Sequence, residues 1–255
     1  MFDLEGYGYG IIVEGAGVTL FVALSSLFIA VLLGMAAALA KLSNSPMAQI
    51  IAGTYTTVIR GVPDLVLMLL IFFGGQIFIN NLPDNILELL LYIGEKTSQG
   101  DALKTAMAPY LDWGYIDVNP LIAGVLTIGF IFGAYMGETF RGAIMAVDRG
   151  MLEAGTAYGM TRIQITRRIL IPQMMRHALP GFGNNWLVLM KATALVSIIG
   201  LSDMVRRAGL AAGATREPFK YYLVVALVFL FFTTLSIWFL KWAERRYSVG
   251  VRRIS

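Results

Sequence analysis

The sequence contains no cysteine, a single histidine and few charged residues. Without cysteine the chain can form neither a disulfide nor a thiolate metal site, and His177 alone cannot build a histidine-rich metal centre. We therefore expect no resident metal and no cofactor. Charged residues make up 14% of the 255 residues, against about 25% in a soluble globular domain. This scarcity of charge argues against a soluble protein.

Two sets of catalytic residues are also missing. No loop of the form G-x-x-x-x-G-K-[ST] occurs, so any energy from ATP must come from another chain. No serine and histidine lie together inside neighbouring apolar runs, which removes the usual nucleophile and base of a membrane-embedded hydrolase. We expect that the chain is not an enzyme.

Apolar runs of bilayer length dominate the sequence instead. Hydrophobic residues make up 57% of the chain, and the mean hydropathy is +0.71. About 20 apolar residues cross a bilayer, so the runs predict an all-α integral membrane protein with one domain over 1–255. The five expected spans are 17–40, 50–79, 121–140, 182–202 and 221–241. Gly61 and Pro63 interrupt the second run, which we interpret as one tilted or broken span.

The basic residues predict the orientation of these spans. Arginines cluster between the third and fourth runs, and lysine and arginine also follow the last run. Since cytoplasmic loops are rich in lysine and arginine, we expect 141–180 and the C-terminus in the cytoplasm. Five spans then place the N-terminus and the acidic segment 80–120 outside. The segment 203–220 is also expected outside, although it carries four basic residues.

The cytoplasmic segment contains a motif with regular spacing, "MLEAGTAYGMTRIQITRRILIPQMMRHALP". Apolar residues recur near helical spacing with arginines between them, and Pro172 and Pro180 limit the second of two short helices. Small residues before Gly159 would let another backbone approach. Two interpretations are open: a docking surface for a partner protein, or an amphipathic helix on the inner leaflet.

This loop resembles the EAA loop of ABC-importer permease subunits, although Gly155 and Ile171 depart from the family pattern. The resemblance implies a type I importer fold in which coupling helices contact a separate ATP-hydrolysing subunit. The matching positions are Glu153, Ala154, Gly155, Gly159, Ile169, Ile171 and Pro172.

Further stretches resemble the polar amino-acid permeases, and most of all the Q subunits of histidine/lysine/arginine/ornithine importers. They include "IRGVPDLVLMLLIFF", "GAYMGETFRGAIMAV" and "KATALVSIIGLSD". The likeness covers nearly the whole chain and is weakest over 82–119. It implies a bacterial inner membrane location and three kinds of partner: a homologous permease subunit in a heterodimer, two ATP-binding subunits that bind ATP and Mg, and a periplasmic amino-acid-binding protein. No nucleic acid is implied.

Four charged residues lie within or beside the apolar runs: Arg60, Asp64, Glu138 and Lys191. An isolated charge at the bilayer centre costs at least about 2.5 kcal/mol, so such charges are paired or face water. We expect Lys191 to pair with an internal acid such as Glu138, or alternatively to meet the α-carboxylate of a substrate. We interpret Arg60, with Gly61 and Pro63, as structural, with Arg60 pairing Glu138 or a free carbonyl. Glu138 equally has Arg141 within one helical turn.

Asp64 follows the break at Gly61 and Pro63, where two roles remain open. Its carboxylate is placed to cap the helix that begins there. Broken membrane helices are also where transporters bind their substrates, and a carboxylate suits a cationic side chain. Weaker candidates for the same substrate-binding cavity are Tyr55, Tyr135, Glu138, Asn185, Lys191, Thr193 and Ser197, the last two expected on one helical face.

These observations favour a permease subunit that translocates basic amino acids (histidine, lysine, arginine, ornithine or related opines) by alternating access. The alternative within the family is a permease for glutamine, glutamate or another polar amino acid, and Asp64 separates the two because an anionic substrate would be repelled by it. A secondary transporter would be expected to show inverted repeats, which the sequence does not show.

Overall fold

The structure, a computed structural model, describes residues 6–95 and 114–247. Within these ranges every regular element is helical, which confirms the all-α fold. The helices are α1 (Ala16–Leu42), α2 (Pro46–Gly61), α3 (Asp64–Glu95), α5 (Pro120–Met145), α6 (Arg149–Ala157), α7 (Arg162–Ile165), α8 (Ile171–Ala192), α9 (Met204–Thr215) and α10 (Pro218–Tyr247). Wider π-helical turns precede α1 and α8, at Gly10–Gly15 and Thr166–Leu170, and a 3-10 turn, Thr193–Ser197, follows α8.

Helix α5 is the centre of the bundle and contacts α1, α2, α3 and α8. Its start is defined locally, since the Asn119 side chain accepts a hydrogen bond from the Leu121 amide at 2.8 Å and Pro120 occupies the first turn. Glycines along α5 let α1 lie close, as small residues do between membrane helices. On α1, a Cβ added to Gly34 would come within 2.5 Å of the Met136 Cβ.

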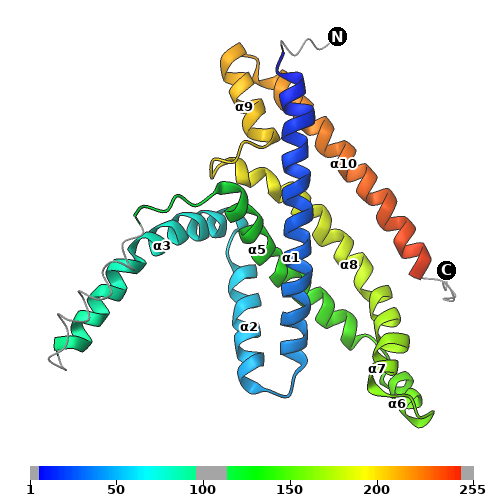
Figure 1. Ribbon diagram of the computed structural model, residues 1–255. Coiled ribbons are helices and arrows are strands. Elements are labelled where there is room, and N and C mark those ends of the chain that lie inside the picture. The colour runs from blue at the N-terminus through cyan, green and yellow to red at the C-terminus, as the bar shows by residue number, and fades with distance from the viewer. Residues whose placement is uncertain (1–5, 96–113, 248–255) are drawn as a thin grey trace.

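The chain turns twice before α3. Ser45 caps α2 and Pro46 starts it, so α2 folds back along α1. Val62 then adopts an extended conformation, as a residue before proline prefers, and α2 cannot continue. The run 50–79, expected to be one interrupted span, is therefore divided between two helices, and α3 leaves the bundle in a different direction from α2 (Figure 1).

Four helical stretches in the described residues are long and apolar enough to cross a membrane: Gly10–Leu42, Asp64–Ile86, Pro120–Met145 and Pro218–Tyr247. The expected span 182–202 falls on the second half of α8 and on the 3-10 turn after it. Part of the expected external segment 80–120 is helical, because α3 extends to Glu95, whereas residues 96–113 lie outside the described residues. The five-span topology and its orientation stay predictions.

Helix α9 carries basic residues that conflicted with the expected external position of 203–220. Arg207 forms an ion pair with Glu14 at 2.5 Å, and Lys220 pairs with Glu217 at 2.9 Å. Acidic partners nearby thus neutralise two of the four basic residues. Asp203 caps α9 by accepting the Arg206 amide at 2.8 Å, and it is only 1% exposed. Burial raises the pKa of Asp203 to about 6.

The close contact between α1 and α5 predicts that two glycine-to-alanine substitutions on α1 affect stability unequally. Gly34→Ala forces a methyl group against Met136, and we expect a loss of about 1–3 kcal/mol from the free energy of unfolding. A Cβ at Gly17 meets nothing within 4 Å, so Gly17→Ala should be neutral or gain up to about 1 kcal/mol from helix propensity. Thermal unfolding of the purified protein in detergent measures both, and equal melting temperatures would refute the close approach.

Candidate functional site

The break between α2 and α3 places Asp64 in the first turn of α3. Pro63 supplies the first carbonyl of that helix and accepts the Leu67 amide at 3.1 Å. The Asp64 side chain is half-buried, and its Oδ1 accepts a hydrogen bond from the Tyr135 hydroxyl of α5 at 3.4 Å. A carboxylate at a helix N-terminus is favoured by the helix dipole. Among residues 6–95 and 114–247, Asp64 therefore has the helix N-terminus and the Tyr135 hydroxyl beside it but no ion pair to a basic side chain.

Arg60 lies on the other side of the same break and shares Tyr135 with Asp64. Its guanidinium carbon is 5.7 Å from the centre of the Tyr135 ring, within range of a cation–π contact. Arg60 is exposed, whereas Tyr135 is half-buried. One tyrosine thus contacts a cation through its ring and a carboxylate through its hydroxyl. We call Arg60, Asp64 and Tyr135 the break site.

Glu138 does not pair with Arg60. Of the two partners expected for Arg60, Glu138 or a free carbonyl, the first is therefore wrong. Its carboxylate instead accepts hydrogen bonds from Lys41 at the end of α1 and from Arg141 Nε at 3.0 Å. The Arg141 pair is the one expected at helical spacing. The Lys41 and Glu138 side chains are 16% and 18% exposed, so each needs a partner of opposite charge.

The other predicted cavity residues are distributed over the bundle. The Tyr55 hydroxyl donates to the Phe130 carbonyl at 2.6 Å, and Tyr55 lines a separate apolar groove between α1, α2 and α5. Asn185 on α8 donates to the Thr139 hydroxyl at 2.9 Å. The structure therefore brings Asp64 together with Tyr135 and places Tyr55 and Asn185 in other contacts.

Thr193 and Ser197 do not share a helical face as expected. They lie in a 3-10 turn, where residues four apart are about 120° apart around the axis. Each hydroxyl donates to a nearby carbonyl, Thr193 to Met190 and Ser197 to Ala194, both at 2.7 Å. Lys191 is exposed and has no ion pair within the part of the chain that the structure describes, so the expected pairing with Glu138 is absent there.

The second candidate site is the loop that contains α6, α7 and the start of α8. Helix α6 ends at Ala157, and Gly159 follows two residues later with a φ of +75°, a conformation that glycine adopts readily. The Met160 amide donates to the Gly155 carbonyl at 3.0 Å and the Gly159 amide to Thr156, also at 3.0 Å, which terminates the helix. Thr161 and Gln164 then form a capping box that starts α7.

Within this loop, Gly155 serves the internal packing rather than the outer surface. It is buried, and an added Cβ would come within 2.9 Å of the Ile169 Cδ1. The exposed positions of the motif are Glu153, Ala154, Gly159, Ile171 and Pro172.

Beside these positions, Tyr158 is 89% exposed and Ile163 is 79% exposed. Ile163 is one of the apolar residues that recur near helical spacing in the sequence. Sequence reasoning did not single out Tyr158, although an aromatic residue beside a glycine-terminated helix is a recognisable signal. The apolar surfaces of Tyr158 and Ile163 are suited to contact another protein.

No group of three metal-ligating side chains gathers in residues 6–95 and 114–247.

Sequence reasoning also missed Lys41 as the partner of Glu138. The available signal was its position, because Lys41 is the only basic residue before Arg60 and follows directly on an apolar run.

Comparison with known proteins gives concordant matches over nearly the whole chain. Residues 30–249 match the family described as binding-protein-dependent transport system inner membrane component. The histidine/lysine/arginine/ornithine transport system permease protein HisQ of Escherichia coli (strain K12) is 49% identical, over 97% of this chain and 98% of that protein. The octopine transport system permease protein OccQ of Rhizobium radiobacter is 35% identical, over 99% of this chain and 96% of that protein.

Solved structures agree with these matches. An amino acid ABC transporter with histidines superposes with a TM-score of 0.70 and 30% identity, covering 92% of this chain and 94% of that chain. An inward-facing methionine ABC transporter, MetNI, superposes with a TM-score of 0.66 at 13% identity, covering 93% and 96% of the two chains, which is a likeness of fold alone.

Because Lys41 and Arg141 both pair with the Glu138 carboxylate, we predict that removing this carboxylate destabilises the bundle. Glu138→Gln leaves Lys41 without its anion, and we expect a loss of about 1–3 kcal/mol in the free energy of unfolding. The double variant Lys41→Met/Glu138→Gln should recover part of this loss, because it removes the unpaired cation. Thermal unfolding in detergent measures both variants.

Glu14→Gln is the matched control, since the Glu14 and Arg207 side chains of that ion pair are 50% and 30% exposed. An exposed pair is worth at most about 1 kcal/mol. Equal destabilisation by the two glutamine substitutions would show that the Glu138 contacts carry no special weight.

Proposed function

This chain belongs to the family of binding-protein-dependent transport system inner membrane components, and on that premise we propose that it is the permease subunit of an ATP-driven importer for basic amino acids. The observation that carries the proposal is the identity of 49% to the histidine/lysine/arginine/ornithine permease over nearly the full length of both chains. The permease protein ArtQ of an Escherichia coli (strain K12) arginine ABC transporter, 34% identical over 95% of this chain and 97% of that protein, supports the same substrate class.

The break site supplies groups that complement such a substrate. A basic amino acid carries a cationic side chain and an α-carboxylate. No basic side chain in the described part of the chain forms an ion pair with Asp64, so its carboxylate is available to a substrate cation. Arg60 is exposed beside it and is suited to the α-carboxylate, while Tyr135 contacts both residues. Thr193 and Ser197 fit less well, because both hydroxyls already donate to nearby carbonyls.

The loop from α6 to α8 is the proposed contact with the ATP-binding subunits. Its folded, internally capped structure supports a role as a rigid docking element, and its outer surface includes Glu153, Ala154, Tyr158 and Ile163. ATP and Mg would bind to those subunits. Their closure would move the loop, tilt the helices joined to it and open the pathway inward. A homologous permease would complete the pathway, and a periplasmic binding protein would deliver the substrate.

Asp64→Asn tests the substrate site. The neutral amide loses a charged contact worth about 1.5–3 kcal/mol, so we expect the KM for arginine uptake to rise about 10- to 100-fold in vesicles that contain the assembled importer. Asp84→Asn is the control, because Asp84 is an exposed carboxylate on the same helix. Unchanged arginine uptake by Asp64→Asn would exclude direct contact. Glutamate uptake that exceeds arginine uptake in the unmodified importer would favour the alternative substrate class.

Ile163→Asp tests the docking loop. Because Ile163 is 79% exposed, a charge there should leave the fold intact but weaken an apolar protein contact. We expect the variant to lose the ATP-binding subunits during co-purification, while Ile163→Leu retains them. If Ile163→Asp keeps both the subunits and the substrate-stimulated ATPase activity, the loop does not dock through this face.

A further inference from the structure

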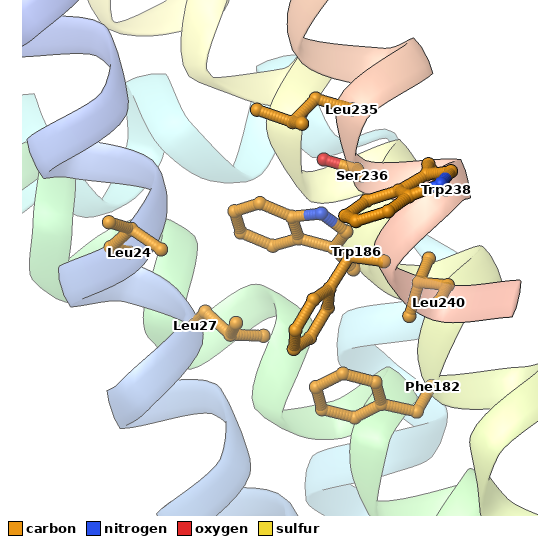
Figure 2. A pocket seen from close by; sticks show the side chains of 9 residues that line it. Leu24, Leu27, Phe182, Trp186, Leu235, Ser236, Trp238 and Leu240 are labelled. Carbon is orange, nitrogen blue, oxygen red and sulfur yellow. The ribbon is translucent and has the colours of Figure 1, made fainter. Parts of the chain in front are cut away.

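An apolar cavity of about 470 Å³ lies between α1, α8 and α10, away from the break site and the docking loop. Figure 2 shows the Trp186 ring at its centre, with α1 side chains on one side and α10 side chains on the other. Eight of the nine lining residues are apolar, and Ser236 is the polar one. The lining consists of Leu24, Leu27, Phe182, Trp186, Leu235, Ser236, Trp238, Phe239 and Leu240.

The inner wall of the cavity is formed by buried side chains, and its outer wall by exposed ones. Trp186 is 8% exposed, whereas Trp238 is 68% exposed and Phe239 is 57% exposed. Where α8 approaches α10, a Cβ added to Gly183 would lie 3.1 Å from the Leu240 Cδ1. The helices therefore touch at this point, and beside it they leave a hollow that is accessible from the surface of the bundle.

The chemistry of the lining excludes the transported substrate as the occupant. A zwitterionic amino acid would find no charged partner there and would lose its hydration without compensation. A hydrocarbon chain meets no such penalty. Because α1 and α10 are among the helices with the length and composition of membrane spans, the surroundings of the cavity supply acyl chains.

A basic residue lies on the cavity face of α10, two turns nearer its C-terminus. Arg246 follows Phe239 by seven residues, which is about 20° from two full turns and about 10 Å along the axis. Lys241 is about 200° around the helix from Phe239 and so points away from the cavity. Both basic side chains are exposed. Directly after Leu240, the last apolar residue of the cavity, α10 becomes rich in charge from Lys241 to Arg246, so Arg246 lies within the polar headgroup region.

We propose that this cavity binds one acyl chain of an anionic phospholipid, with Arg246 contacting the headgroup. The separation of about 10 Å places a charge at headgroup depth above a chain that lies against Trp186, and long arginine side chains reach the interface from such positions. Basic residues beside pockets between membrane helices are known to select anionic lipids. The proposal needs only that the chain is a membrane component, and it is independent of the transported substrate.

Photolabelling of the assembled importer in lipid nanodiscs tests the proposal. The probes are phosphatidylglycerol and phosphatidylcholine that carry the same diazirine near the end of one acyl chain. We expect labelling of peptides that contain 182–186 and 235–240, with phosphatidylglycerol severalfold above phosphatidylcholine. Arg246→Gln should lower this preference about fivefold, whereas Lys241→Gln, the matched loss of charge on the opposite face, should preserve it.

A filling variant separates the cavity from general lipid contact. Ser236→Phe places a ring in the cavity and should reduce labelling by both probes. Thr234→Phe adds the same ring about 200° around α10 and should not. Absence of labelling in the assembled importer would show that a protein partner covers the cavity and would overturn the proposal. Equal labelling by the two probes, or equal effects of the two phenylalanines, would overturn it as well. If the Ser236→Phe variant does not assemble, the comparison of Arg246→Gln with Lys241→Gln tests the proposal on its own.

Discussion

Charge inside a bilayer or at its edge must be paired or hydrated, and this constraint determines how the end of α1 meets α5. Lys41, Glu138 and Arg141 meet where α1 and α5 run together, so the two helices share one carboxylate. Glycines bring the same helices into contact along the bundle. The ion pairs then fix the register of one helix against the other, because a shift of one turn would move Lys41 about 5 Å from its anion. Asp64 is different, since no basic side chain that the structure describes forms an ion pair with it.

Local features of the fold could be predicted from the sequence. The apolar runs indicate an all-α membrane protein, and Gly61 and Pro63 mark the position where α2 ends. The pair of Glu138 and Arg141 follows from helical spacing. These features depend on residues that are close in the chain, where composition and periodicity are informative.

Long-range contacts could not be predicted in the same way. Lys41 and Glu138 are 97 residues apart, and their contact depends on how α1 packs on α5. The shared face of Thr193 and Ser197 assumed an α-helix, but the chain narrows to a 3-10 turn there. Gly155 looked like part of an outer surface, yet its lack of a side chain makes room for Ile169 within the loop. In each case tertiary packing decides, and no single-sequence pattern reports it.

Helix α3 stands apart from the other helices, and its junction with α2 is short. It has 32 residues and is about 48 Å long. Its first half is held in place, because it contacts α5 and because the Gln76 and Asn80 side chains hydrogen-bond to the backbone of Ile116 and Val118 just before α5. The turns from Asn80 to Glu95 extend about 22 Å farther, so a tilt of 5° about Asn80 moves the far tip by about 2 Å. A neighbour that grips these distal turns would therefore act first on the hydrogen bonds of Gln76 and Asn80, and Asp64 lies on the other side of that fulcrum.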